Sequence, residues 1–310
     1  MCVMSKNGIT PQTNGLDTKG HSSNPASSTA LQRMTPLILY GYLFNTICYF
    51  LVYALLPTNL TPAPTYCPDD NPNCTRRDLL AFQIVSFLNL SYLGLLGFYT
   101  FFISKRASNA LPQTPQGRYF GNTLNKGRVL LPEADYVNAV IVIFQGWDFI
   151  ASFFFEEHCT MIMMSHHLLA FICGFFCLLY EVNPYYAVYF GGVSEFSSIF
   201  LCISQLFQFY PQASLVPSSS ILSSILPAIE TFSQAMFVIT FFLFRIVGWA
   251  QQLYMLLSDG SYILKNGLLQ KYSPGSRWFL LYLMTMGFGL GALQVFWLRG
   301  IVDKVLEVIG

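Results

Sequence analysis

Seven apolar stretches dominate this chain of 310 residues. Each is close to the about 20 residues that an α-helix needs to cross a bilayer. Only 10% of the residues are charged, whereas soluble domains carry about 25% and need them to cover their surface. The sequence therefore predicts an all-α, polytopic transmembrane bundle of about seven helices. The predicted spans are 36–56, 79–103, 137–155, 160–180, 186–209, 227–256 and 278–298.

The same pattern divides the chain into four regions. Residues 1–33 are polar and rich in Ser and Asn, which predicts a disordered tail. Residues 34–78 hold the first transmembrane helix and the loop that follows it. Residues 79–300 form a single transmembrane domain, and residues 301–310 a short tail.

The distribution of Lys and Arg predicts the orientation. With seven spans, the amino-terminal tail and the loops 104–136 and 257–277 lie on one side, and they carry eleven of the 16 basic residues. Four lie on the opposite side, and Arg245 lies within a span. Because basic loops stay in the cytosol, we expect a cytosolic amino terminus.

The first loop, 57–78, agrees with this orientation. It contains two glycosylation sequons, at Asn59 and Asn73, which are used only on a luminal face. Cys67 and Cys74 are close enough in sequence to pair in an oxidising lumen. The loop is therefore expected to be luminal and glycosylated.

Ionisable residues within the spans are the candidate site. A charge at the bilayer centre costs about 2.5–3.5 kcal/mol or more, so such side chains usually face the bundle interior. Helical spacing puts Ser198 and Cys202 on the face of Glu195, and Gln234 close to the face of Arg245. The ionisable set is Asp148, His166, His167, Glu195 and Arg245.

Two interpretations of this set stay open. Arg245 could pair with Glu195 or Asp148 and simply lock helices together. Alternatively, one of the adjacent histidines 166 and 167 could accept a proton, with a carboxylate stabilising its charged form. Neighbouring histidines point about 100° apart on a helix, so the pair does not predict a metal site.

The order of these motifs resembles the TLC domain family. Asp148 lies in the preceding helix, followed by His166-His167, then Ser194-Glu-Phe-Ser-Ser198, then a helix ending in Phe-Leu-Phe-Arg245. The resemblance covers roughly residues 80–300. It is closer to the smaller TLC domain-containing proteins than to the ceramide synthases of the same family.

The resemblance implies a membrane cavity that opens to a lipid or an acyl chain. In ceramide synthases, the paired histidines and nearby acids transfer an acyl group from acyl-CoA to a sphingoid base. By correspondence, His166 and His167 would form the acyl-transfer centre, assisted by Glu195 and Asp148. Ser198 departs from that pattern, because the synthases have a second aspartate there. The family also implies residence in the endoplasmic reticulum.

The sequence thus leaves three functions to compare. The first is lipid homeostasis, by binding or sensing an acyl chain or sphingolipid in the cavity. The second is N-acyl transfer with acyl-CoA as co-substrate and no other cofactor. The third is a transporter or receptor. The expected partners are membrane lipid and a second copy of the chain; a net charge of +1 without a basic run predicts no binding of nucleic acid.

Overall fold

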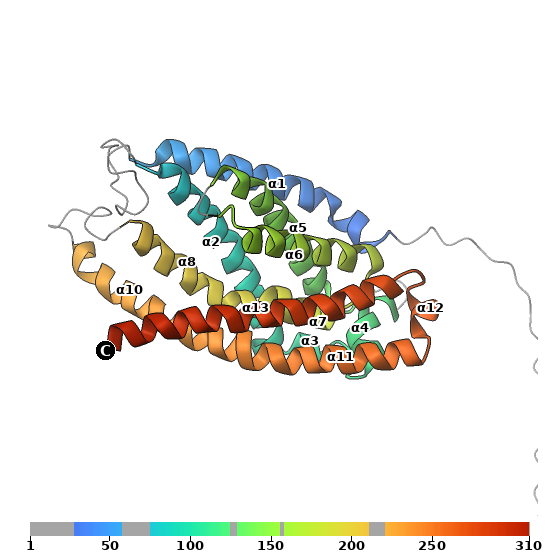
Figure 1. Ribbon diagram of the computed structural model, residues 1–310. Helices are drawn as coiled ribbons and strands as arrows, with labels where there is room; N and C mark the ends of the chain where they lie inside the picture. The colour runs from blue at the N-terminus through green and yellow to red at the C-terminus, as the bar shows by residue number, and fades with distance from the viewer. Residues whose placement is uncertain (1–27, 58–74, 125–128, 156–157, 211–220, 310) are drawn as a thin grey trace, which may run out of the picture.

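The computed structural model describes residues 28–57, 75–124, 129–155, 158–210 and 221–309. Within this part, seven helices are long and apolar enough to cross a membrane. They lie roughly along one direction as an all-helical bundle (Figure 1). The predicted fold class is therefore confirmed. The spans are Ala30–Leu55, Arg77–Ile103, Pro132–Phe154, Met161–Tyr180, Pro184–Phe209, Ile225–Lys265 and Arg277–Asp303.

The helices have these bounds: α1 Ala30–Leu55, α2 Arg77–Phe98, α3 Arg106–Asn109, α4 Pro115–Leu124, α5 Pro132–Ala151, α6 Met161–Tyr180, α7 Pro184–Ala187, α8 Phe196–Phe209, α10 Ile221–Thr240, α11 Trp249–Lys265, α12 Leu268–Tyr272 and α13 Arg277–Ile309. Three spans contain a π-helical segment, in which the hydrogen bonds run from i to i+5. These segments are Tyr99–Ile103, Val188–Gly192 and Phe241–Gly248.

The first helix begins inside the region predicted to be a disordered tail. Thr29 and Gln32 form a capping box, in which each side chain accepts a hydrogen bond from the other residue's backbone N–H, at 3.3 and 3.0 Å. This arrangement satisfies two backbone donors that a helix end otherwise leaves unpaired. Residues 1–27 of the tail lie outside the described part of the chain.

Arg33, in the first turns of α1, connects three helices. Its guanidinium lies 3.1 Å from a carboxylate oxygen of Asp135, in the first turn of α5, and 3.1 Å from one of Glu181, at the end of α6. The three side chains therefore hold α1 to α5 and α6 at one end of the bundle.

Two further boundaries differ from the predictions. Helix α13 continues to Ile309, through the segment 301–310 predicted as a tail. The sixth span is longer than the predicted 227–256, because α11 continues to Lys265, into the segment predicted as the loop 257–277. The sequons at Asn59 and Asn73 and the cysteines at 67 and 74 lie outside the described residues.

The centre of the bundle lies between helices that are distant in sequence. Helix α5 packs most extensively against α6 and also against α1, and α2 packs against α8. Helices α11 and α13 run side by side and are joined through α12 (Figure 1). The space enclosed by α5, α6, α7 with the π-helical segment that follows it, α11 and α13 holds the candidate site.

A buried ion pair fixes the end of the bundle where α4 meets α11. The Arg118 guanidinium donates two hydrogen bonds of 2.7 Å to the Asp259 carboxylate, and the Tyr186 hydroxyl donates a third, of 2.6 Å. The hydrogen-bonded carboxylate raises the pKa of Arg118. In the sequence, Arg118 is only one of the basic residues of the loop 104–136, and this network was not predicted. Its partners are distant in the chain, since Asp259 lies 141 residues from Arg118 and 73 from Tyr186.

Gly97 of α2 lies against the π-helical segment before α8. A Cβ added to Gly97 would lie 2.5 Å from the Cα of Gly192. Backbone atoms cannot give way as a flexible side chain can, so only glycine allows this approach. Small residues commonly allow such close packing between transmembrane helices.

We predict that Gly97→Ala destabilises the protein by about 1–3 kcal/mol or more, because the added methyl group overpacks this contact. Gly289→Ala is the matched control, since a Cβ there meets nothing within 4 Å. Thermal unfolding of the two purified variants in one detergent measures the difference. Equal unfolding temperatures would contradict the close contact.

Candidate functional site

Arg245 is the most heavily bonded side chain of the bundle interior. It is only 8% exposed. Its Nε donates to the backbone oxygen of Ser194 and to the hydroxyl of Ser197, both at 2.9 Å. Its Nη2 donates to Glu195 Oε2 at 2.8 Å and to the Ser198 hydroxyl at 2.7 Å. We call these five residues the arginine cluster.

The structure shows which of the two candidate carboxylates pairs with Arg245. The partner is Glu195 rather than Asp148. The Ser198 hydroxyl also donates to Glu195 Oε2, at 2.7 Å, so it joins the ion pair as a neutral bridge. A second carboxylate at position 198 would instead put two negative charges beside one guanidinium. This serine therefore suits a cluster with no net charge.

His167 belongs to a second polar group, formed with α5. Its Nδ1 lies 2.6 Å from Gln145 Oε1, and its Nε2 lies 3.5 Å from Asp148 Oδ2. Asp148 also accepts a hydrogen bond of 3.2 Å from the Ser152 hydroxyl. Because an amide oxygen only accepts, Nδ1 must carry a proton. Nε2 is then the ring nitrogen that faces the Asp148 carboxyl group.

His166 has a different environment from its neighbour. It lines a pocket, whereas His167 and Asp148 do not. Its Nδ1 is buried and has no hydrogen-bond partner within the described part of the chain. Its ring makes an edge contact with Trp297 of α13, with centroids 5.8 Å apart. His167 is therefore held by α5, whereas His166 faces the pocket.

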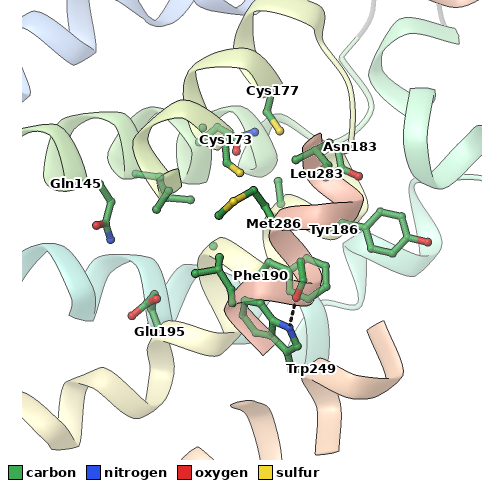
Figure 2. A pocket seen from close by; sticks show the side chains of 18 of the residues that line it. Gln145, Cys173, Cys177, Asn183, Tyr186, Phe190, Glu195, Trp249, Leu283 and Met286 are labelled. Carbon is green, nitrogen blue, oxygen red and sulfur yellow. Dashed lines mark hydrogen bonds between the residues drawn. The ribbon is translucent and has the colours of Figure 1, made fainter. Parts of the chain in front are cut away.

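The pocket lies in the middle of the bundle and is mainly apolar (Figure 2). Its cavity volume is about 100 Å³, and the pocket is partly open to its surroundings. Gln145 and Glu195 lie toward one end, and Asn183 and Tyr186 toward the other. The wall between these ends includes Cys173, Phe190, Leu283 and Met286.

The pocket is elongated along α6 and α13. Its lining on α6 extends from His166 to Cys177, and on α13 from Leu283 to Gln294. Eleven residues of α-helix rise about 17 Å, roughly half the thickness of a bilayer's hydrocarbon core. The helices are antiparallel, because His166 contacts Trp297 while Phe176 contacts Trp278.

The structure brings most of the predicted residues together, but not all. His166, Glu195 and Arg245 line the pocket, and the other two ionisable residues lie behind it. Cys202 is buried outside the pocket lining. Gln234 is exposed and donates to Glu230 at 3.2 Å. The shared face of Gln234 and Arg245 was predicted from a 100° period, and the π-helical segment Phe241–Gly248, which contains Arg245, breaks that period.

Several polar residues of the pocket were not among the predicted site residues, including Asn138 of α5. Gln294 of α13 and Asn183, before α7, are both buried and both line the pocket. The signal for Gln294 was visible, since it is an uncharged polar residue in the middle of the last apolar stretch. Asn183 lay in a turn between two spans, and nothing in the sequence indicated that it faces inward.

Comparison with known proteins adds one match. The family model described as the TLC domain matches residues 80–303, which confirms the resemblance seen in the ordered motifs. No curated protein matches the chain, and no solved structure matches it. The matched range contains both polar groups and every residue of the pocket.

We predict that Arg245→Met destabilises the fold by about 3–5 kcal/mol, because Glu195 would be left as a buried, unpaired charge. Arg299→Met is the control. Arg299 faces Asp303 at 4.0 Å, but its side chain is 86% exposed, so its loss should have no measurable effect. Unfolding temperatures in matched detergent test this, and similar values for both variants would refute a stabilising role for the cluster.

Proposed function

The chain belongs to the TLC domain family, and from this premise we propose that it binds an acyl chain or a sphingolipid in its intramembrane pocket. Its family and its seven candidate spans make it a multi-pass membrane protein with a lipid-related function. Binding or sensing a lipid for lipid homeostasis is the specific role that we propose.

The shape and chemistry of the pocket carry this proposal. It is long and mainly apolar, and its charged pair, Glu195 with Arg245, lies toward one end. Ligand pockets generally combine apolar walls with a few polar groups that fix orientation. A lipid has the same division into a long apolar chain and a small polar end, so the two match.

Filling the pocket provides the test. Leu290 lines it, whereas Leu281 on the same helix is 48% exposed outside it. We predict that Leu290→Trp lowers the amount of co-purified lipid at least fivefold, because the indole takes the space of the chain, and that Leu281→Trp leaves it unchanged. Mass spectrometry of lipid extracted from equal amounts of protein measures both. Equal lipid in the two variants would contradict binding in this pocket.

A second candidate function is N-acyl transfer from acyl-CoA to a long-chain base. The supporting observation is the adjacency of pocket-lining His166 to the His167–Asp148 pair. The amine nitrogen would attack the thioester carbonyl, the C–S bond would break, and the amide would form. His166 would take the proton from the amine and pass it to the departing CoA thiolate.

Under this second function, His166→Gln should lower the rate of labelled amide formation by about 100-fold or more, as expected for loss of a general base. The readout is product from labelled acyl-CoA and long-chain bases with purified protein, with Leu281→Trp as the active control. If the protein holds lipid but forms no amide, acyl transfer is excluded and the binding role stands.

The cellular location, the membrane orientation and the oligomeric state are also proposals. We place the protein in the endoplasmic reticulum with its amino terminus in the cytosol, supported by the excess of basic residues on that side. Glycans on Asn59 and Asn73 and a Cys67–Cys74 disulfide would then be luminal. A homodimer belongs to the same proposal, and the partners would be membrane lipid together with acyl-CoA or a sphingoid base if the protein is an enzyme.

A further inference from the structure

Three buried polar atoms line the pocket without a hydrogen-bond partner in the described part of the chain. They are His166 Nδ1, Gln294 Oε1 and Asn183 Oδ1. Gln294 and Asn183 are only 2% and 4% exposed. The large majority of buried side-chain polar atoms in folded proteins are paired, so each exception requires an explanation. A bound molecule would explain the exceptions that it contacts, because all three atoms line one pocket.

The three atoms are not evenly spread along the pocket. His166 and Gln294 lie at the same end, because His166 contacts Trp297, one helical turn beyond Gln294 on α13. Gln145 and Glu195 also lie toward this end, and Asn183 lies at the opposite one (Figure 2). The end near His166 and Gln294 therefore offers most of the polar groups, and we call it the polar end.

The charge of the pocket limits what the polar end can bind. Among the described residues that line the pocket, only Glu195 and Arg245 carry a formal charge at neutral pH, and they neutralise each other across 2.8 Å. A carboxylate or phosphate buried here would have no counter-charge of its own. Burying an unpaired ion is far more costly than burying a hydroxyl or amide that is hydrogen-bonded. The polar end thus favours a neutral group.

We propose that the pocket takes a neutral lipid whose polar end carries a hydroxyl or an amide N–H. This group donates a hydrogen bond to Gln294 Oε1 and hydrogen-bonds to His166 Nδ1, and the chain extends along α6 and α13 toward Asn183. Ceramides and acylglycerols share this chemistry, whereas free fatty acids and phospholipids do not. The inference rests on the proposed lipid binding and adds the class and orientation of the lipid.

Competition among photoactivatable lipids of equal chain length tests the class. The probes are a ceramide, a diacylglycerol, a fatty acid and a phosphatidic acid, presented to the full-length protein in nanodiscs at neutral pH. We expect one of the neutral probes to label α6 and α13 at least tenfold more than either anionic probe. Which neutral probe it is identifies the source. Equal labelling by an anionic probe would overturn the inference but leave lipid binding intact, whereas no labelling of the pocket by any probe would overturn both.

Substitutions test the orientation. Gln294→Leu should lower neutral labelling about tenfold, the usual effect of losing a buried hydrogen bond. Gln234→Leu makes the same change at the exposed glutamine outside the pocket and should have no effect. Asn183→Gly removes the amide at the other end and suits the positive φ of 69° there; it should also leave labelling unchanged. A loss with Asn183→Gly but not with Gln294→Leu would reverse the proposed orientation.

One substitution tests the role of the charge in the pocket. Glu195→Gln keeps the shape of the side chain but leaves the Arg245 charge uncompensated. Labelling by the fatty acid should then rise at least tenfold relative to the neutral probe. A folded variant whose selectivity is unchanged would refute the electrostatic basis of the inference. If this variant does not fold, the preference of the wild-type protein and the Gln294→Leu result decide.

Discussion

The neutralisation of Arg245 inside the bundle is the interaction on which the centre of this protein depends. A guanidinium removed from water must find both a counter-charge and acceptors for its hydrogens. Glu195, two serine hydroxyls and one backbone oxygen supply them from a single stretch of chain, Ser194–Ser198. The sixth span is thereby fixed to the start of α8. Because the pair forms one wall of the pocket, the same contact sets the pocket's charge near zero.

The two polar groups have different consequences for the pocket between them. The arginine cluster is bonded within itself, with Ser198 hydrogen-bonded to both members of the ion pair. The two histidines differ, since His167 is held by α5 while His166 faces the pocket with a ring nitrogen that has no partner among the described residues. Adjacent positions on a helix differ by about 100°. Because of that angle, His167 faces α5 and His166 faces the pocket, where a ligand can reach it.

Polar contacts at one end of the bundle hold helices that are distant in sequence. Arg33 joins α1 to α5 and α6, and Arg118 joins α4 to α11 through Asp259. Tyr186 donates a hydrogen bond to Asp259 in this network, and it also lines the pocket. The pocket wall thus continues into this network. A change at Arg118 should therefore disturb the pocket as well as the loops outside it.

The sequence by itself determined the fold class, the seven spans, the family and the candidate set around His166 and Arg245. It could do so because the bilayer fixes helix length and makes every ionisable residue in a span conspicuous. Only the tertiary structure decided that Arg245 pairs with Glu195, that Gln234 faces away, and that Gln294 and Asn183 line the pocket. Partner choice depends on how helices distant in the chain pack and on a π-helical segment that alters the helical period, and neither is encoded in local spacing.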